Sequence, residues 1–294
     1  CCSPPRHISS SGQSGMKKFT VQENTNLRAF TDAVYPQGSF ALPRLLRERE
    51  VRVNGAKTGR NVPLCPGDEV TYFTTPKEEA KPFYREVYRD GNILVADKFA
   101  GVSSEALFSA LREDFGARFI HRLDRNTAGL IVFALNGEAE GELLAAFRGH
   151  SVRKEYGAVC FHPFAKKSAV LTAYLKKDAG AARVRVFASP VPGAEKICTE
   201  YETEEVFGEY TRVRILLHSG KTHQIRAHMA FIGNPVAGDE KYGDEALNKK
   251  YHLRRQLLAA EKLSFAFGGA LSYLNGRTFL SSFRAQMPPE QGKA

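Results

Sequence analysis

The stretch HRLDRNTAGL, residues 121–130, runs directly into the apolar segment GLIVFAL at 129–135. A short apolar run of this length predicts a buried strand, so the polar residues before it are expected to form a loop. In that loop, Asp124 stands between Arg122 and Arg125. The arrangement fits a solvated ion pair, and it equally fits a carboxylate held ionised where an anionic partner also binds. The spacing alone leaves both interpretations open.

Similar apolar or alternating runs recur on both sides of this stretch and predict a strand-rich domain. They lie at 92–98, 154–161, 183–187, 199–207 and 210–218. The best helix candidate is KTHQIRAHMAFIG at 221–233, because Ile225 and Met229 fall on one helical face. Strands outnumber helices and are joined by short links. We therefore expect an α+β domain with a mixed or antiparallel sheet rather than a parallel one.

Residues 16–75 are predicted to form a small α+β unit of their own. Helices are expected at 27–34 and 39–49, and VRVNG at 51–55 ends in Asn-Gly, a strong signal for a tight turn. A Pro-Gly-Asp turn then precedes the alternating strand EVTYF at 69–73.

The remaining boundaries follow from local composition. The polar, proline-flanked segment 76–82 is predicted to be a linker, and 83–290 the larger domain. Residues 1–15 contain no apolar centre of the kind found in signal peptides. We expect them to be a disordered leader ahead of a natural start at Met16.

The bulk composition narrows the class of partner. The chain has 294 residues, a net charge of +10 and a pI near 9.4, which favour a polyanion such as a nucleic acid or an anionic membrane surface. Its five cysteines are scattered and form no C-x-x-C pair, as expected in a reducing cytoplasm. No apolar run reaches the roughly 20 residues needed to span a bilayer. Membrane insertion and secretion are therefore not expected.

The segment HSGKTHQIRAH at 218–228 is the second concentration of polar side chains. Its histidines are spaced five apart, so on a helix they would not share a face and a zinc site is not predicted. Lys221 to Gln224 near a helix N-terminus are suited to phosphate, whose charge the backbone N–H groups favour. The alternative is an amphipathic helix with ordinary surface charges.

Four separated motifs resemble those of the RluA-type RNA pseudouridine synthases. They are HRLDRNTAGL, KEYGAV, LLHSGKTHQIRAHMAFIGNPVAGDEKYG and LLAAEKLSF, in that family's order. The resemblance covers roughly 83–285 and implies a pseudouridine synthase catalytic domain. Residues 19–73 resemble the alpha-L RNA-binding domain that often precedes it. The implied reaction isomerises a uridine within RNA, with neither metal nor cofactor.

The resemblance also assigns roles to particular residues. Asp124 is similar to the family's catalytic aspartate, which either attacks the anomeric carbon or removes a proton beside it. Arg226 resembles the arginine that pairs with this aspartate and keeps it anionic. Tyr156 resembles the tyrosine that stacks on the uracil and relays the final proton, although a phenol is a poor base without activation.

Other positions are implied to touch the RNA. Arg122 resembles the arginine that holds the extruded nucleotide or fills the space it leaves. The further expected substrate contacts are Lys221, Thr222, His223, Gln224 and Leu263, with core packing as an equal alternative for Leu263. His121 is expected to be structural. Ala128 and Lys221 replace the serine and arginine common in the family, which bears on target choice rather than on activity.

We therefore expect a monomeric cytoplasmic enzyme acting on structured RNA, with ribosomal RNA favoured and transfer RNA open. One alternative is a non-catalytic RNA-binding or ribosome-assembly factor on the same scaffold. A second is a nucleoside hydrolase. That chemistry usually needs a second acid or a metal, and Asp239 and Asp244 are the nearest candidates.

Overall fold

The computed structural model describes residues 15–178 and 182–286. Its chain divides into two compact units, with the boundary between Pro82 and Phe83. Of the leader expected at 1–15, only Gly15 is described, and its carbonyl accepts from the Thr74 N–H at 2.8 Å. The other leader residues and the last residues of the larger predicted domain lie outside the described residues. Across the residues that are described, no helix is long and apolar enough to cross a membrane.

The first unit is a small sheet covered by helices. Its four main strands are antiparallel in the order β1-β6-β3-β4, and a short β2–β5 pair lies apart. The strands are β1 (Met16–Thr20), β2 (Thr25–Asn26), β3 (Val51–Val53), β4 (Ala56–Thr58), β5 (Pro63–Leu64) and β6 (Glu69–Phe73). The helices are α1 (Leu27–Val34), α2 (Pro36–Arg47) and α3 (Pro76–Glu79). Buried leucines, valines and tyrosines between the helices and the sheet form a separate core.

Two local features of this unit bear on the sequence expectations. The Asn-Gly turn is present between β3 and β4, with φ of 51° at Asn54 and 80° at Gly55. The segment expected as a linker differs, because its first half forms α3. Thr75 caps this helix, and Arg44 of α2 binds Glu78 at 2.6 Å, so the segment belongs to the packed unit.

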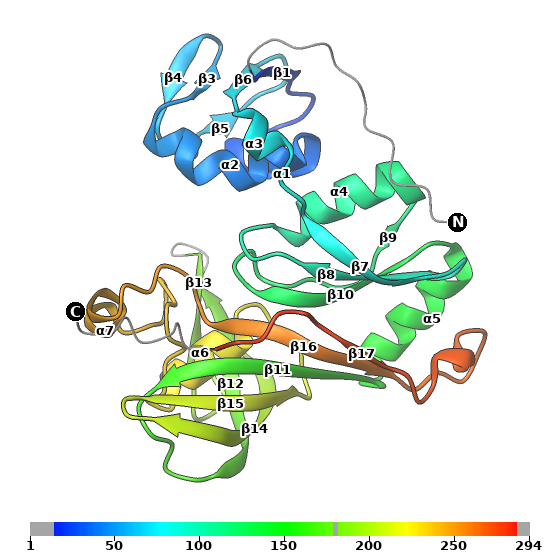
Figure 1. Cartoon of the computed structure of the whole chain (residues 1–294), viewed down its shortest axis with the longest axis vertical. Helices are drawn as coiled ribbons and strands as arrows, with labels where there is room; N and C mark the ends of the chain where they lie inside the picture. Colours follow the sequence, from blue (N-terminus) through cyan, green and yellow to red (C-terminus); the bar gives the residue numbers. More distant parts are fainter. Residues whose placement is uncertain (1–14, 179–181, 287–294) are drawn as a thin grey trace. The chain divides into compact units, whose positions relative to one another are not determined.

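The second unit is built on one large sheet, and the predicted α+β class with a mixed sheet is confirmed. The strand order is β13-β12-β14-β15-β11-β16-β10-β8-β7, with β17 beside β16 and β9 beside β10. All pairs are antiparallel except β10 with β16. Figure 1 shows β16 next to β11, although about a hundred residues separate them in the chain. The strands are β7 (Tyr84–Arg89), β8 (Ile93–Lys98), β9 (Arg118–Phe119), β10 (Ala128–Ala134), β11 (Val152–Phe161), β12 (Ser168–Asp178), β13 (Arg183–Phe187), β14 (Glu195–Phe207), β15 (Tyr210–Leu217), β16 (Leu258–Phe265) and β17 (Thr278–Leu280).

The helices of this unit begin and end at ordinary signals. They are α4 (Ser104–Phe115), α5 (Gly137–Arg148), α6 (Gln224–Phe231), α7 (Glu245–Lys250) and the 3₁₀ turn η1 (Ser272–Leu274). Ser103 caps α4 by accepting from the Ala106 N–H, and Asn136 caps α5 in the same way. Gly116 ends α4 in the left-handed conformation that favours glycine.

The interior of the sheet explains why its strands are apolar along their whole length. All six residues of β8 are buried, as are those of β10 after its first residue, because both faces of these central strands are covered. Side chains of β8, β10, α5 and β16 share one core. The predicted helix at 221–233 is shorter than expected and is not amphipathic. Helix α6 starts at Gln224, and its polar residues Arg226 and His228 are buried with the apolar ones.

Candidate active site

The loop between β9 and β10 carries Asp124 and is held on both sides of that residue. The Ser104 hydroxyl donates to the Leu123 carbonyl and accepts from the Leu123 N–H, both at 2.9 Å. On the other side, Gln256 donates to the Thr127 hydroxyl at 2.7 Å. The Thr127 N–H in turn donates to the Asp124 carbonyl at 3.0 Å. These hydrogen bonds restrict the backbone of the loop at Asp124 and thereby fix the position of its carboxylate.

Lys98, at the end of β8, adds a buried cation beneath the same loop. Its ammonium donates to the carbonyls of Val102 at 2.8 Å, Arg125 at 3.2 Å and Asp124 at 3.3 Å, and to its neighbour Phe99. Burial lowers the pKa of Lys98 to about 7, although the charge of Asp124 opposes that shift. Lys98 therefore ties the Asp124 loop to the 99–102 turn through carbonyl oxygens alone.

Gly129 is the next-to-last residue of HRLDRNTAGL, and packing leaves no room for a side chain at this position. Its φ is 110°, and a Cβ atom would stand 2.2 Å from the Ala260 carbonyl oxygen. This close approach is where β10 pairs in parallel with β16. The glycine thus lets β16 lie directly against the strand that follows Asp124.

Arg226 projects from α6 and binds two carboxylates at once. Its Nη1 donates to Asp124 Oδ2 at 2.9 Å, across 102 residues of sequence. Its Nε and Nη2 form a two-pronged contact with Asp239, at 2.6 and 2.9 Å. Burial alone would lower the pKa of Arg226, but the bonds and charges of Asp239 and then Asp124 outweigh it and raise that pKa. One guanidinium is therefore shared by two acids.

Asp239 is the residue that sequence reasoning missed in this role. Its side chain is fully buried, and it also accepts from the backbone N–H groups of Lys241 and Tyr242 at 2.8 and 3.1 Å. Burial would raise the pKa of Asp239, but the bonds and charge of Arg226 and these N–H groups lower it. From the sequence, Asp239 in the turn-rich segment GDEKYGD was only a candidate for the second acid of a nucleoside hydrolase.

Asp124 opens onto a cavity of about 680 Å³. That volume is in the usual range for a small-ligand site. Asp124 is the one carboxylate that lines it among the described residues, and its side chain is 17% exposed. Six lysines and arginines line it as well: Arg122, Arg148, Lys154, Lys196, Lys221 and Arg226. The cavity is thus strongly cationic around a single acid.

Tyr156 lies in the wall of the same cavity, on β11. The residue is buried, and burial first and the charge of Asp124 second raise the pKa of its phenol. Tyr156 and Asp124 therefore line one cavity, and the phenol of Tyr156 stays protonated there at neutral pH.

The other residues expected to contact substrate fall into two groups. Arg122, Lys221, Thr222 and His223 all line the cavity. Arg122 is exposed and forms an ion pair with Glu105 at 3.0 Å, while Lys221 pairs with Glu195. Exposed pairs of this kind are weak, so both cations remain available to a phosphate.

Gln224 lines the cavity as expected, whereas Leu263 does not. The Gln224 amide donates to Cys198 and Thr199, and its oxygen accepts from Ser219 and from the Lys221 N–H, so its hydrogen-bonding capacity is used within the protein. Leu263 is buried in the core shared by β8, β10 and β16 and is absent from the cavity lining, where Leu258 of the same strand lies. Of the two alternatives for Leu263, the structure favours core packing.

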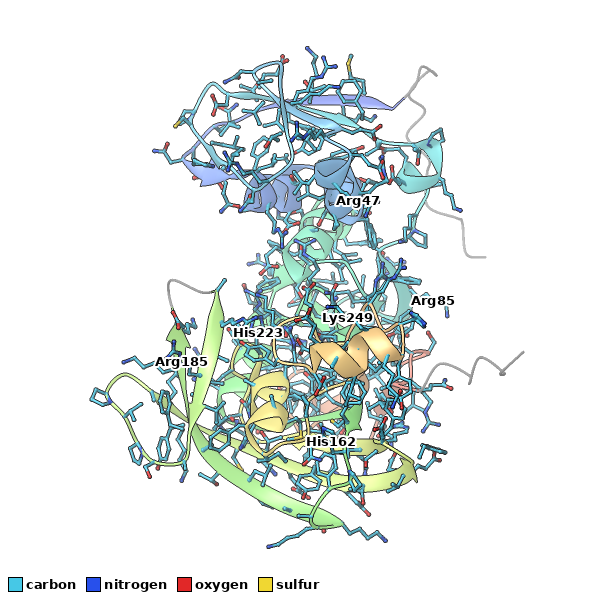
Figure 2. All side chains as sticks on the ribbon, turned by 90° about the vertical axis from the view of Figure 1, so that its left-hand side faces the viewer. Arg47, Arg85, His162, Arg185, His223 and Lys249 are labelled. Carbon is cyan, nitrogen blue, oxygen red and sulfur yellow. The ribbon has the colours of Figure 1, made fainter. Side chains whose placement is uncertain are left out.

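The histidines of the two motifs are held by separate partners. The His121 ring stacks on Phe147 and its Nε2 accepts from the Val132 N–H, which leaves the proton on Nδ1. Burial lowers the pKa of His121 to about 3. His223, which precedes the first turn of α6 (Figure 2), has a left-handed backbone and bonds to the Tyr242 hydroxyl at 2.9 Å. His228 is buried against Thr199.

Comparison with known proteins identifies the class to which this site belongs. A family model described as RNA pseudouridylate synthase matches residues 96–231. An uncharacterized RNA pseudouridine synthase of Mycoplasma pneumoniae is 31% identical over 288 residues, covering 85% of this chain and 88% of the relative. Ribosomal large subunit pseudouridine synthase C of Vibrio cholerae is 32% identical over 254 residues, with 76% and 78% covered.

Solved structures agree at the level of the fold. Human RNA Pseudouridylate Synthase Domain Containing 1 superposes with a TM-score of 0.56 at 24% identity, covering 68% of this chain and 91% of that one. Human RNA Pseudouridylate Synthase Domain Containing 4 gives 0.55 at 20% identity, with 69% and 88% covered. The chain belongs to the RluA-type RNA pseudouridine synthases. It is accordingly an isomerase whose substrate is RNA.

Proposed function

We propose that this enzyme converts uridine to pseudouridine in ribosomal RNA and that Asp124 is its catalytic carboxylate. The observation that carries the proposal is the cavity in which Asp124 is the one acid among the described residues, held by Arg226 at 2.9 Å and flanked by Tyr156. The choice of ribosomal RNA rests on the relative from Vibrio cholerae, which is named for the large ribosomal subunit.

The reaction requires a carboxylate near the sugar and no external reactant. The bond between the anomeric carbon and N1 breaks, the uracil turns, and its carbon 5 bonds to the same sugar carbon. Carbon 5 then loses a proton and N1 is left protonated, so atoms and electrons balance. Asp124 starts this either by attacking the anomeric carbon or by removing a proton beside it. Its ion pair with Arg226 favours the ionised form that both routes need.

Tyr156 is proposed to stack on the uracil. Burial and the neighbouring carboxylate raise the pKa of its phenol, which makes a phenolate base unfavourable at neutral pH. The ring can still provide a flat surface against which the detached base turns. The stacking role is thus better supported than proton abstraction by this residue.

Extrusion of the uridine from its stack costs a few kcal/mol, which contacts at the cavity must offset. Arg122, exposed at the cavity and paired with Glu105, is proposed to hold the RNA there. Lys221, Thr222 and His223 are proposed to contact the substrate from the opposite loop.

Two features argue against the hydrolase alternative. Asp239, the nearest second acid, is buried against Arg226 and is absent from the cavity lining. Asp244 is engaged as the cap of α7, where it accepts from the Leu247 N–H. A water-activating carboxylate beside Asp124 is therefore missing from the described part of the cavity.

The first unit is proposed to be an accessory RNA-binding domain of the alpha-L type. On its hairpin, Arg52 and Lys57 stand directly opposite each other, and both are exposed. Like charges in this position destabilise a sheet unless an anion lies across them. Arg49 and Arg60 flank the same hairpin and are also exposed. Among the described residues these four cations have no ion pair, and an RNA backbone would supply the anion.

The proposed activity is tested first with Asp124→Asn. The variant should form no pseudouridine in ribosomal RNA transcripts, while its affinity for the same RNA stays within about threefold, since the six cations that line the cavity are all retained. The target is found by mapping pseudouridine in total RNA with and without the gene. Pseudouridine formation by Asp124→Asn would refute the assignment of the catalytic residue.

The accessory role is tested with the full chain carrying Arg52→Gln and Lys57→Gln. The slope of log affinity against log salt should fall by about 1.4 to 1.8 for a large RNA, because about 0.7 to 0.9 counterions are released for each of the two phosphate contacts removed. Turnover of a short stem-loop should be unchanged. An unchanged salt slope on the large RNA would remove the hairpin from the RNA-binding surface.

A further inference from the structure

Among the described residues, Lys154 is the cation of the cavity wall that is withdrawn from bulk water without an opposite charge bound to it. It lies on β11, and its pKa is lowered by burial. The described residues give it neither a hydrogen bond nor an ion pair. Other cations of the cavity differ: Arg226 binds two carboxylates, and Lys221 and Arg122 each bind a glutamate. Taking an ammonium out of water without an opposite charge is unfavourable, and such a position is retained where a ligand supplies that charge.

The surroundings of Lys154 keep its ammonium facing the cavity. The Nζ atom lies 5.6 Å from the centre of the Phe147 ring, a weak cation–π contact. On the other side, a Cβ atom on Gly220 would stand 3.5 Å from the same Nζ, so the glycine leaves room beside it. The adjacent acid Glu155 does not neutralise Lys154, because it binds Arg153 at 3.0 Å and Arg214 at 3.5 Å.

The position of Lys154 along β11 relates it to the proposed base site. Lys154 and Tyr156 are two residues apart, and both line the cavity. Alternate residues of a strand lie on one face roughly 7 Å apart. The extra residue of the local bulge, Glu261, is on β16, so β11 keeps its alternation. A nucleotide whose base stacks on Tyr156 therefore has its backbone within reach of Lys154.

The ligand chemistry follows from charge. Uracil and ribose are neutral before reaction, whereas the phosphodiester links are the anions of an RNA substrate. Arg148 and Lys196, both exposed and lining the same cavity, extend the positive surface around Lys154. We propose that Lys154 binds a phosphodiester group flanking the target uridine and thereby holds the extruded nucleotide in the cavity. This inference rests on the proposed function, which places a uridine beside Tyr156.

The test uses Lys154→Gln, which removes the charge, and Lys154→Arg, which retains it. Binding is measured in the Asp124→Asn background on a short RNA containing the mapped target, so that turnover does not interfere. Lys154→Gln should weaken binding about tenfold and reduce the salt slope by about 1. Lys154→Arg should restore most of both. Lys262→Gln is the matched control, because Lys262 is an exposed lysine on the neighbouring strand β16 outside the cavity lining.

A chemical change in the RNA identifies the partner directly. An uncharged methylphosphonate is placed at the link on the 5′ or 3′ side of the target uridine. At one of these links the methylphosphonate should weaken RNA binding about tenfold when the protein retains Lys154. The same methylphosphonate should not further weaken RNA binding by the Lys154→Gln variant. Additive losses at both links would overturn the proposal. A fall in kcat caused by Lys154→Gln in an enzyme that retains Asp124, with affinity and salt slope unchanged, would also overturn it and would place Lys154 on the uracil instead.

Two further measurements separate the possible failures. The thermal midpoint of each variant, compared with that of Lys154→Arg, detects misfolding that would mimic a loss of binding. If Lys154→Gln keeps full affinity while the unmodified enzyme forms pseudouridine, the lysine only packs on Phe147 and the proposal fails alone. If the unmodified enzyme forms no pseudouridine in the bound RNA, the proposed function fails instead.

Discussion

Asp239 and Asp124 share Arg226, and neutralising each of them should have a different effect. We expect Asp239→Asn to lower the stability of the fold and Asp124→Asn to abolish the activity. Asp239→Asn removes the charge from a fully buried side chain that accepts four hydrogen bonds, two from Arg226 and two from backbone N–H groups. An asparagine keeps one acceptor oxygen and turns an amide N–H₂ toward a guanidinium donor. Breaking a buried ion pair on one side costs about 3 to 5 kcal/mol. We expect the free energy of unfolding of the second unit to fall by that amount.

Asp124→Asn should behave differently at the same arginine. Its carboxylate makes one contact with Arg226 and is 17% exposed, and an asparagine oxygen can still accept from Nη1. The expected cost is below about 1 kcal/mol, while activity is lost. A loss of 3 to 5 kcal/mol is a large part of the 5 to 15 kcal/mol that stabilises an ordinary domain. Asp239→Asn should therefore also show reduced soluble yield.

The assay is urea unfolding of both variants at pH 7, with the transition of the second unit compared between variants. The pH dependence provides an internal check. Because the folded-state pKa of Asp239 is lowered, its contribution is complete above the unfolded value of about 3.9 and is lost as pH falls through the folded value. The gap between wild type and Asp239→Asn should then shrink below about pH 4. Equal costs for the two variants would refute this division of roles.

Three further outcomes are expected. Tyr156→Phe should keep RNA affinity and most activity, whereas Tyr156→Ala should lose at least about tenfold in kcat/KM; similar losses in both would give the hydroxyl a chemical role. His228 has a folded pKa lowered to about 4 by burial, so the unfolded state binds more protons below pH 6.5. Unfolding free energy should drop by about 1.4 kcal/mol more in wild type than in His228→Gln between pH 7.5 and 5.5, as measured by urea titration at each pH. Lys98→Met leaves several carbonyls of the Asp124 loop unpaired and should lower kcat at least about tenfold without weakening RNA binding; full turnover would show that the loop holds without it.

Local sequence was sufficient for most of the secondary structure. The apolar runs at 92–98 and 129–135 correspond to β8 and β10, and helix α1 has the predicted bounds Leu27–Val34. These predictions succeed because side-chain spacing and turn residues act over a few positions. The short helix α3 was expected as a linker, because a four-residue helix has no periodicity to detect and depends on its cap and on Arg44.

The site was only partly readable in the same way. The HRLDR and THQIR motifs indicated Asp124 and Arg226, and the structure brings them to 2.9 Å. No local pattern could show that Asp239 takes the other edge of that arginine. The commitment of Gln224 to internal hydrogen bonds was equally hidden, because it depends on Cys198 and Thr199, which belong to a distant strand.

Sequence by itself determined the strands, the class of enzyme and the acid at the centre of the site. Those properties reside in short patterns that are independent of the rest of the chain. Tertiary structure alone decided which charges are paired, which are exposed and which face the cavity. Lys154 and Lys262 are both lysines in strands, yet only Lys154 lines the cavity. The exposure of the two ammonium groups differs because segments far away in sequence cover Lys154 and leave Lys262 exposed to water.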